Sequence, residues 1–353
     1  MLKKTIRRLG ALAMVLAMAV SVFAVNASAA EGAEVTYTTI GSFTKKVTTD
    51  GNTFAPNTTF KYTVKGAAAG SATVKNSDNT ETKIEYYAGK DGDIVFTNTA
   101  FTPSSSVSSE YTANGDIQMK AGAYTNPGIY HYTVQEEDGK YDGIIYDTAI
   151  RHVFVYVVNG DNNTVKVENI LITNGNFEKV DGTFTNNYGS GENNSTHDVT
   201  IKKTLEGNMA DATKEFNFDV IVTPADGAKE KYKVELDGKE IDPLVVSDNG
   251  VAQMTYKLKG GHNVKIYGLS TNDVVSVTEQ EANSDGYTTT TTYTNFSAEN
   301  GKATADGAVI DVKNAKHNAT PGGVIMTIAP YALMVVLAGA FAVVFLTRRN
   351  RAE

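Results

Sequence analysis

Two lysines in this sequence stand where an amine could become a nucleophile. Successive side chains on an extended strand point to opposite faces, so in SFTKKVTTDG the side chain of Lys45 shares a face with Phe43 and Val47. In TIKKTLEG the side chain of Lys203 shares a face with Ile201 in the same way. An amine on an apolar face is costly to bury unless it is neutral or paired. Both lysines are therefore candidates for unusual chemistry.

A glutamate and an asparagine follow each lysine along the chain, and strand alternation aims them inward as well. Glu136 follows the apolar positions of IYHYTV, and Glu279 follows those of DVVSVT. Asn186 lies in the short strand GTFTNN, and Asn314 ends VIDVKN. The order Lys, Glu, Asn thus occurs twice, which indicates a duplicated architecture.

A buried trio of this kind can form an isopeptide bond. Burial lowers the pKa of a lysine and raises the pKa of a glutamate, so the amine can become neutral and the carboxyl protonated. The amine then attacks the carboxamide carbon of the asparagine, while the glutamate polarises the amide oxygen and shuttles protons, and ammonia leaves. The alternative is a buried Lys-Glu salt bridge with the asparagine as a hydrogen-bonding neighbour.

Strands must position these residues. Alternating aromatic runs such as TFKYTV and EFNFDV recur between turn-forming residues, and the 353-residue chain has only 7 prolines. We expect an all-β chain with two tandem β-sandwiches, residues 31–190 and 191–318, separated near the polar string YGSGENNST. The net charge of -8 and the lack of a basic cluster argue against a nucleic-acid partner.

Both ends carry targeting patterns. Residues 1–30 combine basic residues, an apolar stretch and a run of small residues, which is typical of a secretory signal peptide. Residues 319–353 contain an apolar stretch, 324–347, that is long enough for a transmembrane helix, and the basic tail after it predicts a cytosolic C-terminus. The middle of the chain is therefore expected outside the cell, where its lack of cysteine excludes disulfides.

The sequence resembles a known family over nearly its whole length, the two-domain major pilins of the streptococcal type, which are built from pilin isopeptide-linkage domains. The likeness lies in the motifs FTKKV, YTVQEE and FTNN, and then in TIKKTLEG, SVTEQEANSDGYTT and VKN. The resemblance implies immunoglobulin-like folds of the collagen-adhesin B type. It also implies two isopeptide bonds, Lys45 to Asn186 and Lys203 to Asn314, with Glu136 and Glu279 as their catalysts.

The same resemblance implies a structural role, as the backbone or shaft subunit of a Gram-positive surface pilus, and no enzyme activity beyond self-crosslinking. In such pilins a sortase joins a lysine of one subunit to the C-terminal sorting motif of the next. Lys179 in NFEKVDGTFTN matches that lysine. The implied partners are a sortase, further copies of the subunit, and peptidoglycan or the cell membrane.

The sorting motif departs from the family pattern. The stretch NATPGGVIM keeps Pro321 and Gly323 of a Pro-Thr-Gly type motif, but Gly322 replaces the threonine. Three alternatives follow: a sortase accepts Gly322, cleavage follows Thr320, or the chain stays in the membrane as a single-pass protein.

A second function is open, a monomeric surface adhesin on the same folds, anchored singly and with an unknown ligand. Lys179 and the lack of room for a large additional N-terminal domain favour the shaft subunit. The sequence predicts no cofactor and no metal site, because its 5 histidines lack metal-ligand spacing and it has no phosphate or dinucleotide loop. His131 alternates outward from the face of Tyr130 and is expected to be an ordinary strand residue.

Overall fold

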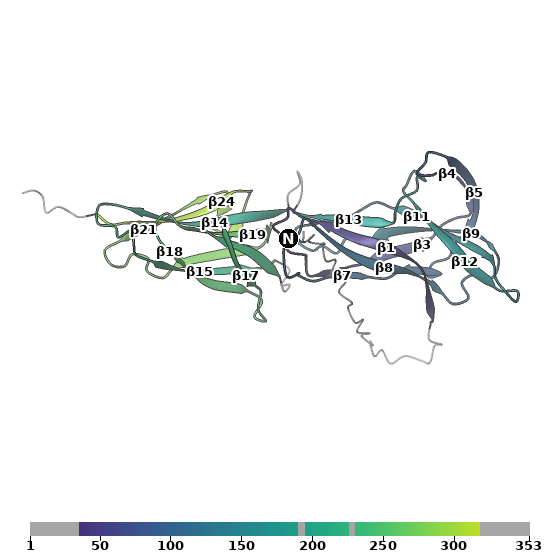
Figure 1. The fold of residues 1–353 in the computed structure, drawn as a ribbon, viewed down its shortest axis with the longest axis horizontal. Helices are drawn as coiled ribbons and strands as arrows, with labels where there is room; N and C mark the ends of the chain where they lie inside the picture. The colour runs from purple at the N-terminus through teal and green to yellow at the C-terminus, as the bar shows by residue number, and fades with distance from the viewer. Residues whose placement is uncertain (1–34, 190–194, 226–229, 318–353) are drawn as a thin grey trace, which may run out of the picture. The chain divides into compact units, whose positions relative to one another are not determined.

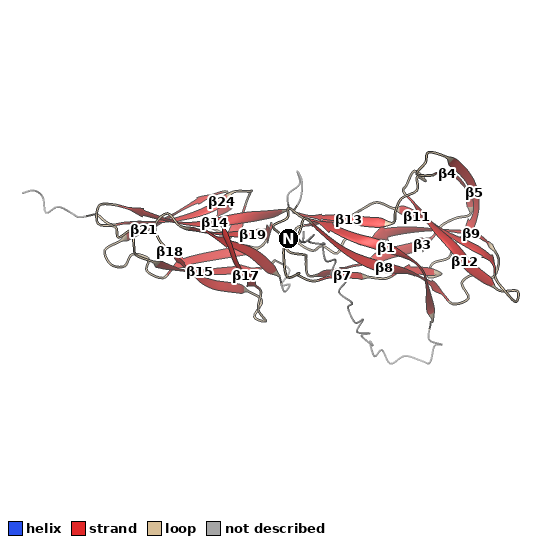
Figure 2. Ribbon diagram, in the orientation of Figure 1, coloured by secondary structure: helices blue, strands red, loops and turns tan. Residues whose placement is uncertain are grey.

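The computed structural model describes residues 35–189, 195–225 and 230–317. Every helix or strand assigned in these ranges is a β-strand (Figure 2), so the expectation of an all-β chain is confirmed. None of the described residues belongs to a helix that is long and apolar enough to cross a membrane. The expected signal peptide, the expected helix at 324–347 and the sorting residues 320–323 lie outside the described residues.

The strands form two sets, which follow one another along the chain (Figure 1). The first set comprises β1 (Tyr37–Thr48), β2 (Thr58–Phe60), β3 (Tyr62–Gly66), β4 (Gly70–Lys75), β5 (Glu81–Ala88), β6 (Ile94–Phe96), β7 (Thr99–Phe101), β8 (Glu110–Lys120), β9 (Gly128–Glu136), β10 (Ile144–Ile145), β11 (Arg151–Asn159), β12 (Val165–Thr173) and β13 (Thr183–Tyr188). The second set comprises β14 (Thr196–Glu206), β15 (Phe216–Thr223), β16 (Lys231–Leu236), β17 (Lys239–Val245), β18 (Ala252–Leu258), β19 (Asn263–Ser270), β20 (Val274–Glu279), β21 (Thr288–Thr294), β22 (Phe296–Ser297), β23 (Lys302–Ala303) and β24 (Ala308–Ala315).

The first set makes a β-sandwich from two main sheets. One sheet has the order β10-β13-β1-β8-β6, and the other has the order β12-β11-β9-β5-β4, with β3 also paired to β9. The first strand, β1, runs parallel to the last, β13, in a register that places Val47 opposite Asn186. Aromatic rings fill the core between the sheets; the ring centroids of Phe43 and Tyr62, for example, lie 4.7 Å apart.

The second set repeats this plan with different sheets. One has the order β17-β16-β19-β14-β24-β21, and the other has the order β18-β15-β20. Here too the first strand, β14, runs parallel to the last long strand, β24, and Leu205 lies opposite Asn314. In both sandwiches the residue that pairs with the asparagine in the parallel register lies two positions after the lysine. The lysine and the asparagine are therefore near neighbours on adjacent parallel strands.

A small second core lies on the outer face of the first sandwich. His131 does alternate away from the main core, as the strand pattern predicts, but it is only 6% exposed. Its ring stacks on the buried ring of Phe154 at a centroid distance of 4.7 Å. Val74 of β4 and Ile84 of β5 belong to the same apolar cluster as Phe154. His131 is thus a buried residue and not an ordinary surface residue of a strand.

Candidate crosslinking sites

The first trio meets inside the first sandwich. The Nζ of Lys45 lies 2.6 Å from Oε2 of Glu136, and the Nδ2 of Asn186 donates to Oε1 of the same carboxylate at 2.5 Å. Lys45 and Asn186 are completely buried, and the side chain of Glu136 is as well. One carboxylate therefore bridges an amine and a carboxamide without contact with bulk water.

The strands explain this meeting. Lys45 and Asn186 come from the adjacent strands β1 and β13 of one sheet, whereas Glu136 ends β9 in the other sheet. Alternation turns all three side chains into the space between the sheets. The ring of Phe60 covers the amine, with Nζ 4.5 Å from the ring centroid. Lys46, the next residue, is partly exposed and pairs with Glu110 instead.

The second trio has the same geometry. The Nζ of Lys203 lies 2.7 Å from Oε2 of Glu279, and the Nδ2 of Asn314 donates to Oε1 at 2.5 Å. The lysine and the asparagine are completely buried, and Glu279 is 6% exposed. Lys203 and Asn314 belong to β14 and β24 of one sheet, and Glu279 to β20 of the other. The amine lies 4.3 Å from the ring centroid of Phe216.

Burial sets the protonation of these groups. Desolvation lowers the pKa of Lys45 to about 8, although the neighbouring carboxylate of Glu136 opposes the shift. Desolvation likewise raises the pKa of Glu136, against the opposing effect of Lys45. In the second sandwich burial lowers the pKa of Lys203. The shifts move the amines toward the neutral form, which is the nucleophilic one.

The amide oxygens of the two asparagines are bound by groups that the sequence patterns did not single out. Oδ1 of Asn186 accepts from the backbone N–H of Asp147 at 2.8 Å, and Oδ1 of Asn314 accepts from the hydroxyl of Thr289 at 2.7 Å. We expected the glutamates to polarise these oxygens, but both carboxylates contact the amide nitrogen instead. The nearest sequence signal is that Thr289 is part of the quoted SVTEQEANSDGYTT motif; Asp147 follows β10 in an irregular segment and carries no signal.

Asp147 is itself held in place by Arg151. The guanidinium donates to Oδ2 of Asp147 at 2.7 Å and to the backbone oxygen of Thr183 at 2.8 Å. It also lies over the ring of Phe184, 4.0 Å from the centroid. The Asp147 carboxylate in turn accepts from the backbone N–H groups of Ala149 and Thr185. The backbone N–H that binds Asn186 is thus fixed by a small network.

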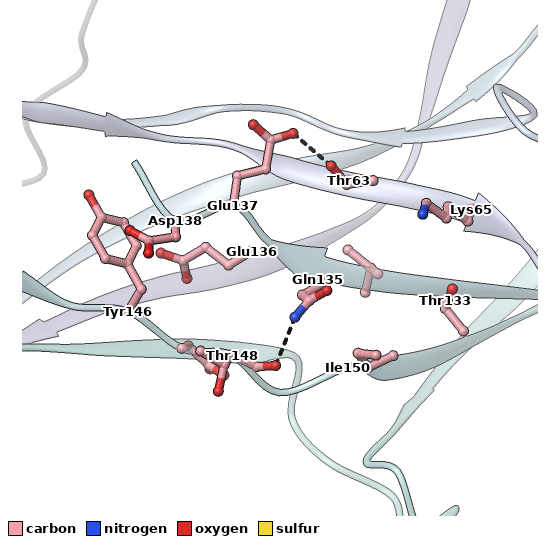
Figure 3. Close-up of a pocket in the computed structure, with 12 residues that line it drawn as sticks. Thr63, Lys65, Thr133, Gln135, Glu136, Glu137, Asp138, Tyr146, Thr148 and Ile150 are labelled. Carbon is pink, nitrogen blue, oxygen red and sulfur yellow. Dashed lines mark hydrogen bonds between the residues drawn. The ribbon is translucent and has the colours of Figure 1, made fainter. Parts of the chain in front are cut away.

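A pocket of about 490 Å³ opens beside the first trio (Figure 3). Glu136 and Asp147 are among the residues that line it. Two hydrogen bonds hold its rim, from the Gln135 side chain to the backbone oxygen of Thr148 at 2.9 Å and from Thr63 to Glu137 at 2.7 Å. Of the trio, Glu136 is among the lining residues, whereas Lys45 and Asn186 are not.

The arrangement suits an amide exchange between side chains. The lysine Nζ would bond to Cγ of the asparagine, and the Cγ–Nδ2 bond would break. The carboxylate contacts both nitrogens, so it can accept a proton from Nζ and deliver one to Nδ2, which leaves as ammonia. No other reagent is needed to balance the exchange.

Lys179 is exposed in the segment between β12 and β13. Its backbone N–H donates to the backbone oxygen of Lys75 in β4 at 2.9 Å, and it forms an isolated bridge with Thr173. The side chain is accessible while its backbone is held.

Among the described residues no group of three or more His, Cys, Asp or Glu side chains could hold a metal ion.

Comparisons with known proteins divide the chain as the strands do. Residues 34–189 match the family model described as Spy0128-like isopeptide containing domain. Residues 197–316 match a family described only as a domain of unknown function, DUF7601. The curated protein named "Pilin" from Streptococcus pyogenes serotype M1 is 26% identical over 313 residues, which covers 85% of this chain and 87% of that protein.

Solved structures share the fold. The major pilin protein T3.2 from S. pyogenes serotype GAS13637 matches with a TM-score of 0.56 at 20% identity, over 79% of this chain and 99% of the other. A second major pilin from S. pyogenes gives a TM-score of 0.55 at 21% identity, over 78% and 99%. These solved structures show that the chain shares its fold with the S. pyogenes major pilins. The chain as a whole resembles the two-domain streptococcal major pilins, as the motifs of the sequence indicate.

Proposed function

We propose that this protein is the shaft subunit of a Gram-positive surface pilus and that it crosslinks itself through Lys45–Asn186 and Lys203–Asn314 isopeptide bonds. The observation that carries the proposal is the pair of buried trios, in which one carboxylate contacts the attacking amine and the departing amide nitrogen. The match to an isopeptide containing domain and the pilin relative support it. The chain is not an enzyme in any further sense.

The two bonds suit a fibre under tension. Each would join the first and last long strands of a sandwich, β1 to β13 and β14 to β24. A force applied along the chain could then not peel these strands from the sheet, because the covalent bond carries it. Such a bond also replaces the disulfides that the chain, with no cysteine, cannot form.

Intact mass tests the self-crosslinking directly. The folded mature protein is expected to weigh less than its sequence by two ammonia molecules, one for each sandwich. Peptide mapping is expected to find Lys45 joined to Asn186 and Lys203 joined to Asn314. A mass equal to that of the unmodified mature chain would mean that the trios are only buried ion pairs.

Polymerisation is proposed to use Lys179 of one subunit and the sorting signal at residues 320–323 of the next, joined by a sortase. The exposed side chain of Lys179 supports this assignment. The subunit would be exported and anchored to peptidoglycan, or held in the cell membrane if the sorting signal is not cut. Mature protein that still ends at Glu353 would rule out sortase processing.

Replacement of Lys179 with arginine is expected to abolish the high-mass ladder in immunoblots of cell-wall extracts. The guanidinium stays protonated and cannot serve as the acceptor amine. The matched control is Lys166→Arg, because Lys166 is an exposed lysine on the neighbouring strand β12. If Lys179→Arg keeps its ladder, or if branched peptides map only to other lysines, then Lys179 has no part in assembly. A parent protein that gives a single band would favour the monomeric adhesin.

A further inference from the structure

Each asparagine oxygen has a hydrogen-bond donor that belongs to neither the lysine nor the glutamate, and the donors differ between the sandwiches. The first is the backbone N–H of Asp147, and the second is the hydroxyl of Thr289. Attack by an amine on a carboxamide moves negative charge onto this oxygen. A donor placed there before the reaction stabilises the developing charge, as in an oxyanion hole.

We propose that Thr289 is a catalytic residue of the second crosslink, a role that rests on the proposed self-crosslinking. As Nζ of Lys203 bonds to Cγ of Asn314, the electron pair of the carbonyl bond moves onto Oδ1, where the Thr289 hydroxyl donates to it. Glu279 takes the proton from Nζ and passes it to Nδ2. The carbonyl then re-forms, the Cγ–Nδ2 bond breaks, and ammonia leaves.

The hydroxyl of Thr289 is oriented for this role by Asn283. The backbone N–H of Asn283 donates to Oγ1 of Thr289 at 2.9 Å, and the side-chain oxygen of Asn283 accepts from the backbone N–H of Thr289, also at 2.9 Å. Oγ1 accepts this hydrogen bond through a lone pair, and its own proton is donated to Oδ1 of Asn314. Asn283 has a φ of 57°, a left-handed conformation that asparagine tolerates better than most residues.

The strand register places Thr289 at the reacting group. Thr289 lies directly opposite Asn314 in the antiparallel pair of β21 and β24, so the two side chains share a face. It is half-buried, whereas the other residues of this threonine-rich strand are exposed. The first sandwich uses a backbone donor at the equivalent place, the N–H of Asp147, so its crosslink is expected not to respond to changes at Thr289. The first crosslink is therefore an internal control within the same chain.

The test measures the rate of each crosslink in the full chain. Unreacted protein, purified in urea, is diluted into folding buffer, quenched in acid at set times and mapped by mass spectrometry. Thr289→Ala and Thr289→Val are expected to slow formation of Lys203–Asn314 about 100-fold, the usual effect of removing one oxyanion donor. Thr289→Ser is expected to stay within a few-fold of the parent. The rate of Lys45–Asn186 is expected to be unchanged in all three variants.

Controls separate the hydroxyl from the fold. Thr290→Val changes the adjacent, outward-facing threonine and is expected to leave both rates unaltered. If valine disturbs folding, which circular dichroism of each variant would show, the comparison of alanine with serine decides. The proposal is overturned if Thr289→Ala reacts at the parent rate, or if Thr289→Ser is as slow as Thr289→Ala. A parent protein that never loses ammonia from its second sandwich would instead overturn the proposed function itself.

Discussion

A Lys45→Met variant is expected to unfold in its first sandwich at a temperature roughly 10 to 20 °C below that of the parent. The Lys45–Asn186 bond would close a loop that spans nearly the whole sandwich, and by the chain-entropy model a loop of this size contributes about 4 to 5 kcal/mol. Methionine has a similar volume and no charge, so it fills the space under Phe60 with little packing cost. The loss therefore reports mainly on the covalent bond.

In the Lys45→Met variant, the carboxyl of Glu136 loses its lysine partner but keeps a hydrogen-bond partner in Asn186. Burial already raises the pKa of Glu136, so without Lys45 its carboxyl can stay protonated and keep its hydrogen bond with Asn186. No unpaired charge is then trapped between the sheets. The second sandwich has its own trio and is expected to unfold as in the parent.

The neighbouring lysine provides the matched control. Lys46 is 32% exposed in its side chain and pairs with Glu110 at 2.9 Å. Exposed ion pairs contribute about 0.2 to 1 kcal/mol. Lys46→Met is therefore expected to lower the unfolding temperature by no more than about 4 °C. Differential scanning calorimetry measures both shifts, and mass spectrometry checks that Lys45→Met loses one ammonia and Lys46→Met loses two. Equal melting temperatures of the two variants would show that the first sandwich gains no stability from the Lys45–Asn186 bond.

The rate of the first crosslink is expected to rise about tenfold per pH unit below pH 7 and to level off above about pH 8. Only the neutral amine attacks, and burial lowers the pKa of Lys45 to about 8. The rate is expected to rise with pH because the lowered pKa lets Lys45 lose its proton at a lower pH than an ordinary lysine does. A pKa below the ordinary value makes the neutral amine abundant at a lower pH, with about one tenth of the amine neutral at pH 7. At an ordinary lysine pKa the neutral fraction at pH 7 is below about one thousandth.

This pH profile is measured by dilution of urea-unfolded chain into buffers between pH 5.5 and 9.5, with an acid quench and intact mass. Tyrosine fluorescence records folding in parallel. Only time points taken after folding is complete are used to fit the crosslinking rate. A rate that falls above pH 8 would mean that the reaction needs the proton on Glu136, and a rate that does not change would mean that amine ionisation does not limit it. Either result would contradict attack by the free amine with the carboxylate as proton carrier.

Local sequence patterns are sufficient to assign which side chains face inward. Period-two alternation separates Lys45 from Lys46 with no knowledge of the fold, since adjacent residues on a strand must point to opposite sides. The structure agrees, because Lys45 is fully buried and Lys46 is not. The all-β class and the repeated order of lysine, glutamate and asparagine were also evident from local patterns, which depend on neighbours along the chain.

The packing of distant strands fixes which groups these side chains contact. The parallel pairing of β1 with β13, and of β14 with β24, joins residues from opposite ends of each sandwich, and no local pattern encodes that register. The same holds for the amide-oxygen donors, since Asp147 acts through a backbone N–H and Thr289 depends on its position opposite Asn314. His131 became buried because the β4 and β5 strands cover an outer face that alternation alone assigns to solvent. Side-chain direction is a property of a single strand, whereas contact and burial depend on which strands pack together.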